Sequence, residues 1–216
     1  QALYSNSFSR PEERIFWLQQ AADQGFANSM VKLARAHLKQ LASNLPYDAI
    51  EAERLYKKAI ERAEEPDAQY GLAQLLLEGR ATVAEGTTIR QLLNQAVALL
   101  EAAALSGHEY ARFNLGIAHL YGYADSGAAG GRDIDLAAEW FEVCGLAEGY
   151  EALSMYYNSK RDTVLAQKWK RRAAKMGWGS HWRRIARERT GSGGAGGVDL
   201  NMAWPPLPDG AKPPTW

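Results

Sequence analysis

Cysteine, net charge and long apolar runs are what this sequence has least of. Cys144 is the single cysteine, so no disulfide can form within the chain. The 25 lysines and arginines equal the 25 aspartates and glutamates, and a neutral chain lacks the basic excess typical of nucleic-acid-binding proteins. The longest apolar stretch, 95–105, is interrupted by Glu101 and is far shorter than a membrane span. We therefore expect no nucleic-acid partner and no transmembrane segment.

The residue patterns of common catalytic and metal sites are also missing. No Cys-x-x-Cys, His-Glu-x-x-His or paired-carboxylate spacing accompanies the four histidines, which are His37, His108, His119 and His181. Residues 191–196 fit the form G-x-G-x-x-G, but a dinucleotide site needs a strand before it and a helix after it, so a flexible linker is the better interpretation. No G-x-S-x-G motif is present, and Cys144 replaces a small residue at a helix crossing. We expect no enzyme activity, cofactor, metal ion or small-molecule substrate.

Short motifs recur along the chain. Residues 17–25 and 169–177 share Trp, Ala, Ala and Gly at the same offsets, and a third copy starts at Leu99. A second motif, Leu-x-x-Ala-His-Leu, occupies 33–38 and 115–120. The spacing places small residues and one bulky packing residue on a single helical stripe, and the glycine suits a left-handed C-cap. These units predict an all-α protein, a right-handed α-solenoid of about five helix-turn-helix repeats. We expect ten helices, the last over 178–190.

The chain divides into four parts on this interpretation. A lead-in of residues 1–10 precedes the repeat array at 11–190, and a Gly-rich linker at 191–197 leads to an extended Pro/Trp-rich tail at 198–216. The prolines of the tail exclude a helix and favour an extended conformation. Trp204 and Trp216 make the tail too apolar to be left in water. We expect it to dock on its own array, which we favour, or on a partner.

The segment 99–122 carries the most complete copy of the pattern, with Ala-Ala-x-x-Gly, then Ala111, Leu115-Gly116 and Gly122. It resembles the Sel-one-like repeat family, a relative of the tetratricopeptide repeats, and the resemblance extends over roughly 11–189. The resemblance implies a protein–protein interaction module. Family members act as adaptors in signalling, in the assembly of bacterial envelope machinery, and as immunity proteins beside lipase-type effectors of type VI secretion. The resemblance favours an immunity protein that binds and occludes a cognate toxin; an assembly scaffold or adaptor is the alternative.

The neutral total hides an asymmetry along the chain. Residues 1–159 contain 13 Lys and Arg against 21 Asp and Glu, whereas residues 160–189 contain 11 against two. A basic segment of this kind can steer an acidic partner, or it can be a solvated face that caps the last repeat. The candidate partner-binding residues of this segment are Arg171, Arg172, Arg183, Arg184 and Arg187.

A glycine-rich insertion at 123–132 lengthens one connection between repeats. Insertions in repeat proteins often map to one face, sometimes the binding face, although a tolerated insertion is equally compatible with the sequence. We expect it to project as a loop, with Tyr123, Asp125 and Arg132 as candidate contacts.

The expected compartment depends on the N-terminus. The chain starts at Gln1 rather than Met, which favours a removed leader and a periplasmic location. A single thiol also fits the cytoplasm, which is the alternative.

Overall fold

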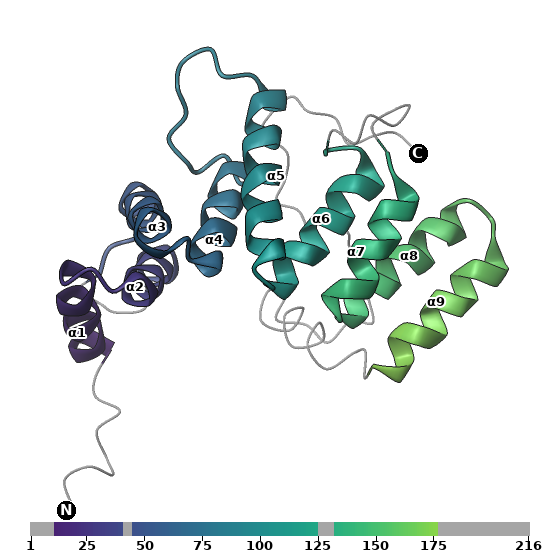
Figure 1. Ribbon diagram of the computed structural model, residues 1–216, viewed down its shortest axis with the longest axis horizontal. Helices are drawn as coiled ribbons and strands as arrows, with labels where there is room; N and C mark the ends of the chain where they lie inside the picture. Colours follow the sequence, from purple (N-terminus) through teal and green to yellow (C-terminus); the bar gives the residue numbers. More distant parts are fainter. Residues whose placement is uncertain (1–10, 41–44, 125–131, 177–216) are drawn as a thin grey trace, which may run out of the picture. The chain divides into compact units, whose positions relative to one another are not determined.

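The computed structural model describes residues 11–40, 45–124 and 132–176, which fold into nine α-helices and contain no strand (Figure 1). This confirms the all-α helical-repeat class. The helices are α1 (Pro11–Asp23), α2 (Ala27–Lys39), α3 (Ala49–Ala63), α4 (Pro66–Leu77), α5 (Ile89–Leu105), α6 (Glu109–Tyr121), α7 (Ile134–Cys144), α8 (Ala147–Ser159) and α9 (Thr163–Lys175). The expected lead-in, tenth helix, linker and tail lie outside the described residues.

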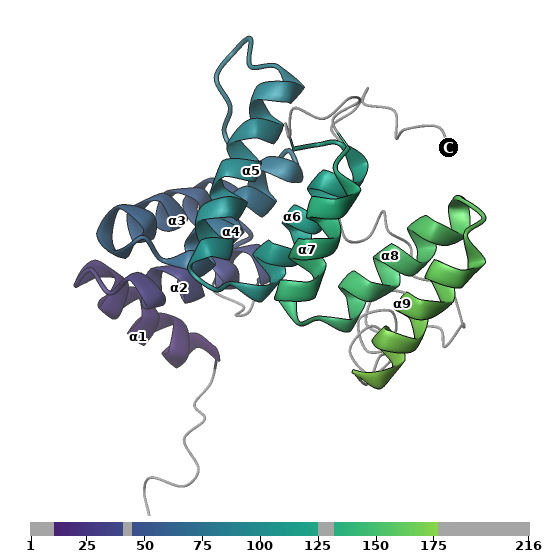
Figure 2. The ribbon, with the colours of Figure 1, turned by 45° about the vertical axis from the view of Figure 1, so that its right-hand side comes forward.

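The chain forms two compact units. Unit 1 is Gln1–Ser106 with α1 to α5, and unit 2 is Gly107–Trp216 with α6 to α9. Within the units, the most extensive packing joins α2 with α3, α4 with α5, α6 with α7, and α8 with α9. Figure 2 shows the last of these pairs side by side. Three of these four pairs are joined by the longer connections, not by the glycine turns, so the repeat unit starts one helix later than the sequence motifs suggest.

Glycines end helices as the repeats predict. Gly25 after α1 and Gly107 after α5 occupy equivalent positions, and both have a φ of 94°, where a residue with a side chain would be strained. The N–H of Phe26 donates to the carbonyl of Ala21 over 3.1 Å, which closes the end of α1. The third glycine of this motif, Gly177, lies outside the described residues.

The repeat equivalence of Trp17 and Trp169 predicts that both are packing residues, and this prediction is correct only for Trp169. Trp169 is 7% exposed and stacks on the ring of Tyr150 in α8, with ring centroids 5.8 Å apart. Trp17 is 68% exposed. The difference follows from the neighbours, since α9 has α8 before it, whereas no described helix precedes α1.

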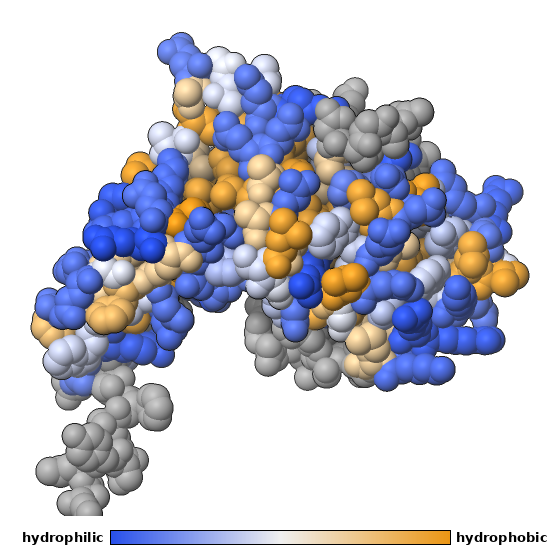
Figure 3. Space-filling view, in the orientation of Figure 1, coloured by the Kyte–Doolittle hydropathy of each residue, from blue (hydrophilic) through white to orange (hydrophobic). Residues whose placement is uncertain are grey.

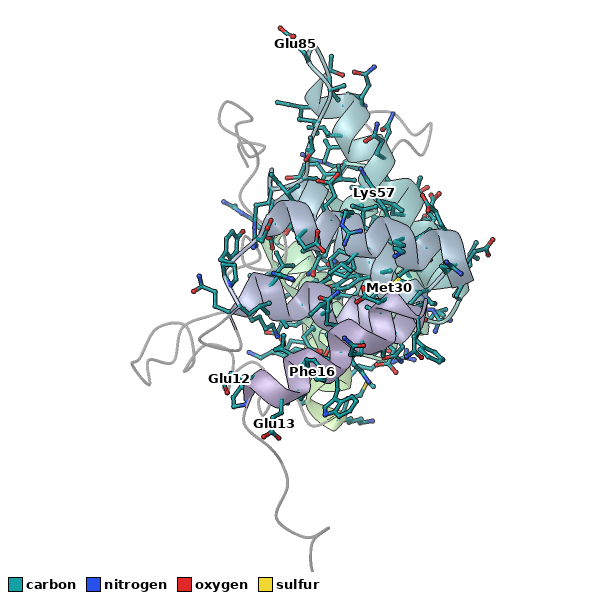
Figure 4. The ribbon with its side chains drawn as sticks, turned by 90° about the vertical axis from the view of Figure 1, so that its left-hand side faces the viewer. Glu12, Glu13, Phe16, Met30, Lys57 and Glu85 are labelled. Atoms are coloured by element: carbon teal, nitrogen blue, oxygen red, sulfur yellow. The ribbon has the colours of Figure 1, made fainter. Side chains whose placement is uncertain are left out.

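The hydrophobic core of unit 1 lies between α2, α3 and α4. Its fully buried side chains include Met30, Leu33, Leu55 and Leu75. Figure 4 shows Met30 among the helices, while Phe16 lies on the outer side of α1.

Unit 2 contains glycines that are required for close approach between helices. The fully buried ring of Phe141 in α7 lies against Gly116 of α6 and Gly149 of α8. A Cβ on Gly149 would lie 2.8 Å from the Cβ of Phe141, and a Cβ on Gly116 would overlap the ring. The same arrangement occurs in unit 1, where the Tyr56 ring fills the space beside Gly71.

We expect Gly116→Ala to lower the free energy of unfolding by about 1–3 kcal/mol, measured by denaturant titration. Alanine favours the helix by up to about 1 kcal/mol, but the overlap with Phe141 outweighs this gain. In a Phe141→Leu background the cost of Gly116→Ala should fall by at least about half, because the smaller side chain leaves room. An equal cost in both backgrounds would contradict this account.

A buried carboxylate holds the α4–α5 connection to α3. The Glu53 side chain is 5% exposed, its Oε1 accepts from Lys57 Nζ over 2.6 Å, and its Oε2 accepts from the N–H of Thr82 over 2.6 Å. Burial alone would raise the pKa of Glu53, but these hydrogen bonds favour the ionised form, and the net shift of the pKa is downward. The ionised carboxylate therefore stabilises the folded unit.

Glu53→Gln should lower the free energy of unfolding by about 1–3 kcal/mol at pH 7, because both donors lose their ionised acceptor and the amide has only one acceptor oxygen for the two. A lowered pKa stabilises the fold above the pKa of the unfolded chain, about 4.3, and this contribution is lost as the pH falls through the folded value. The difference between Glu53→Gln and the parent chain should therefore shrink below about pH 4. A difference that stays constant from pH 7 to about pH 3 would contradict the assignment.

Candidate protein-binding surface

The position of α9 is fixed by contacts along one side. Asp162 caps its first turn by accepting from the N–H of Leu165 over 3.0 Å, and Ser154 Oγ of α8 donates to the Ala166 carbonyl over 2.9 Å. Ala166, Trp169 and Ala173 form the stripe of α9 that is buried. The opposite side of the helix is therefore held outward in one orientation.

That outward side carries three cations, which we call the cationic stripe: Lys168, Arg171 and Lys175. Together with Val164, which is 78% exposed, they follow the i, i+4, i+7 and i+11 spacing of a single helical face and line an open groove. In Figure 3 the surface over α9 is largely hydrophilic. A positive face beside an exposed valine can accept an acidic protein surface.

Arg172, by contrast, is engaged within unit 2. Its guanidinium carbon lies 5.0 Å from the ring centroid of Tyr150 and 5.8 Å from that of Trp169, and its Nη1 is 3.1 Å from Glu142 Oε1 of α7. The sequence predicts Arg172 and Arg171 as partner-binding residues alike. In the structure Arg172 joins three helices, whereas Arg171 donates a hydrogen bond to Gln167 Oε1 on its own helix over 3.3 Å.

A second feature of this surface is a shallow groove with two tyrosines at the end of α8, which we call the tyrosine groove. Tyr156 and Tyr157 have ring centroids 5.4 Å apart, and Lys160 Nζ lies 5.7 Å from the centroid of the Tyr156 ring. Arg132 and Asp162 also line the groove. Burial raises the pKa of Tyr157, and neighbouring negative groups add to the shift, so the hydroxyl stays protonated at neutral pH. Tyrosine and arginine are the side chains that protein interfaces favour.

The two ends of the 123–132 insertion are held together. The N–H of Tyr123 donates to the Ala118 carbonyl over 2.8 Å, and the N–H of Asp133 donates to the His119 carbonyl over 3.0 Å. Burial raises the pKa of Tyr123, and the positive charge of Arg132 opposes this shift. Tyr123 thus packs at the base of the insertion, while Arg132 reaches the tyrosine groove.

The other candidate residues cannot be placed on this surface. Those that lie outside the described residues are Asp125, Arg183, Arg184, Arg187, Trp204 and Trp216. Tyr156, Tyr157 and Lys160 were not predicted from the sequence. Their only signal in the sequence was a pair of adjacent aromatic residues, and folding alone brings that pair beside Arg132.

The cysteine and two of the histidines of the repeats are buried among packed helices. Burial raises the pKa of Cys144 to about 11, and its thiol donates to the Phe141 carbonyl over 3.2 Å. His37 and His119, at equivalent repeat positions, are both buried. Within the part of the chain that the structure describes, no three His, Cys, Asp or Glu side chains form a group that could hold a metal ion. No helix there is long and apolar enough to span a membrane.

Paired helices with small residues at their crossings define a helical-repeat protein. The Sel1 repeat pattern matches residues 15–26, 27–63, 66–108, 109–142 and 146–178, and the chain belongs to the Sel1 repeat family. The last four ranges coincide with the four most closely packed helix pairs. Sel1 repeat proteins are generally protein-interaction modules.

Solved structures share this fold. A Sel1 repeat protein from Oxalobacter formigenes is 21% identical with a TM-score of 0.57, over 88% of this chain and 76% of that one. The c5321 protein, a protective antigen present in uropathogenic Escherichia coli strains, is 24% identical with a TM-score of 0.57, over 83% of this chain. The match spans only 37% of the c5321 chain. No curated protein matches the sequence significantly.

Arg172→Ala should lower the free energy of unfolding by about 1–2 kcal/mol, because two cation–π contacts and a half-exposed ion pair are lost. Arg171→Ala is the matched control, and its effect should stay within about 0.5 kcal/mol. Thermal or denaturant unfolding of both variants measures the difference. Equal effects at the two positions would show that Arg172 does not join the helices.

Proposed function

We propose that this protein is a non-enzymatic binding module that holds an acidic surface of a partner protein against unit 2. The observation that carries the proposal is the cationic stripe, because it presents three charges on a helix whose other side is locked into the core. A preorganised surface loses little conformational entropy when it binds. Membership of a family of interaction modules supports the same conclusion.

The tyrosine groove adds aromatic side chains to the charged surface. Lys160 and Asp162 of the groove adjoin Thr163 and Val164 of α9 at the α8–α9 turn, so the two features are continuous in the chain. Charged residues at the rim of an interface mainly raise the association rate, whereas aromatic anchors at its centre slow dissociation. We assign the first role to the cationic stripe and the second to Tyr156 and Tyr157.

For the partner, we propose a secreted bacterial toxin of the lipase-type effectors delivered by type VI secretion, with this protein as its immunity protein. The mechanism is occlusion, in which the bound module covers the entrance to the active site of the toxin. The proposal places the protein in the periplasm, where such an effector would act. Its support is the resemblance to immunity proteins of the same repeat family and the surface described above.

The test uses the product of the gene that adjoins the one for this protein. We expect that product to be toxic when expressed alone, to be neutralised by co-expression of this protein, and to bind it in biolayer interferometry. A neighbouring product that neither binds nor is neutralised would refute the immunity role. A stable complex with several envelope proteins in its place would indicate an adaptor.

Charge reversal tests the proposed surface. Lys168→Glu, Arg171→Glu and Lys175→Glu together should slow association with the partner at least about tenfold at low salt, and the difference should shrink as salt screens the charges. A matched control reverses three exposed cations of unit 1 and gives the same net charge: Lys32→Glu, Lys39→Glu and Arg90→Glu. If both triple variants slow association equally, net charge matters and the cationic stripe does not.

A further inference from the structure

The inner helix α3 repeats the motif of residues 17–25, with Leu55 in the place of Trp17 and Ala59 in the place of Ala21. It buries two stripes, one for each neighbouring helix. In α3, the first stripe consists of Ala52, Leu55 and Ala59, each at most 2% exposed. The second stripe contains Glu53 and Tyr56, both buried, and the Tyr56 ring packs on α4. A helix of this type therefore needs a partner on both sides.

The helix α1 buries only the second of these stripes. Ile15 and Ala22, at the positions of the second stripe, are 7% and 2% exposed. Arg14 and Trp17, at the positions of the first stripe, are exposed, and Phe16 lies beside Trp17 with ring centroids 5.3 Å apart. Figure 4 shows Phe16 on the outer side of α1. Nothing among the described residues covers this aromatic side.

The pair α8 and α9 shows what the first stripe packs against. Trp169 of α9, the equivalent of Trp17, stacks on Tyr150 with an interplanar angle of 9°. Ser154, one turn after Tyr150, donates to the carbonyl of Ala166, one turn before Trp169. The two helices thus run antiparallel, and the partner of the exposed tryptophan in α1 should be a helix of the α8 type.

The segment 178–190 carries the sequence of such a helix. Trp182 stands as far after Gly177 as Tyr150 stands after the glycine that ends α7, and Ile185 takes the place of the buried Leu153. Small residues also match, since Ala186 follows Ile185 as a serine follows the leucine in α8. The chain thus encodes both members of one helix pair at distant positions in its sequence.

The charges of α1 and of the segment 178–190 are complementary when the two are aligned as α9 and α8 are. Because α8 and α9 run antiparallel, the equivalent pairing would place the acidic first turn of α1, with Glu12 and Glu13, next to Arg187 and Arg189. The asymmetry of the whole chain has the same sense, with acidic residues before 160 and basic residues after it. Opposite charges on α1 and on 178–190 favour their association with each other, and they disfavour pairing of two copies of α1 or of two copies of 178–190.

We propose that this protein self-associates head to tail, with the segment 178–190 of one copy packed on the first stripe of α1 in the next. Trp182 stacks on Trp17 across the junction. Each copy carries one of each surface, so the contact is heterologous and can add copies at either end. A single helix pair is a small interface, so the association should be reversible and of roughly micromolar affinity.

The test measures weight-average mass by sedimentation equilibrium over a concentration range from roughly 1 to 500 µM. The parent chain should grow in mass with concentration. Trp17→Glu and Trp182→Glu should each raise the dissociation constant at least tenfold. Circular dichroism checks that both variants stay folded, and Trp17→Ala serves as a second, uncharged variant. Ile50→Glu is the control, since Ile50 is 71% exposed and lies in α3 rather than in either proposed segment.

Mixing the two variants gives the sharper result. Trp17→Glu retains an intact 178–190 and Trp182→Glu retains an intact α1, so an equimolar mixture should form a heterodimer and nothing larger. A parent chain that is monomeric throughout, a Trp17→Glu variant that associates like the parent, or a mixture without heterodimer would each overturn the proposal. Concentration-independent burial of Trp17 in a monomer would show instead that the segment folds back on its own chain.

Discussion

Unit 2 depends on the lack of a Cβ at two positions that meet one aromatic ring. Phe141 fills the space that Gly116 and Gly149 leave open, and this contact brings α6, α7 and α8 within reach of each other. The positions of α8, and of α9 packed on it, follow from this approach. The orientation of the cationic stripe and the shape of the tyrosine groove are therefore consequences of how closely three buried helices can pack.

The charged side chains of unit 2 divide into two kinds that composition alone does not separate. Arg172 is held by two aromatic rings and Glu142, and this arrangement fixes the last described helix pair. The cations of the stripe lie on the outer side of the same helix, where Lys168 Nζ is 5.0 Å from the centroid of the Trp169 ring. A binding surface thus lies beside the contacts that keep it rigid, which suits a module that recognises a partner without rearranging.

Several features were predictable from the sequence because they depend on local geometry. The glycine caps at Gly25 and Gly107 follow from the backbone of a helix end, and the helical stripes follow from residue spacing. The exposure of Trp17 was not predictable in this way, because its motif is the same as that of Trp169 and only the neighbouring helix differs. Arg171 and Arg172 are likewise adjacent in sequence, and only the placement of α7 shows which of them pairs with Glu142.

The single cysteine has a consequence for how the molecule can be followed in solution. Cys144 is buried at the end of α7, and its thiol donates a hydrogen bond to the Phe141 carbonyl. A thiol reagent therefore reaches it only when this part of unit 2 opens. The rate of modification then reports the local opening equilibrium of one helix junction, without any engineered label. In a repeat protein, whose units unfold with some independence, one natural probe confined to one unit distinguishes local fraying from global unfolding.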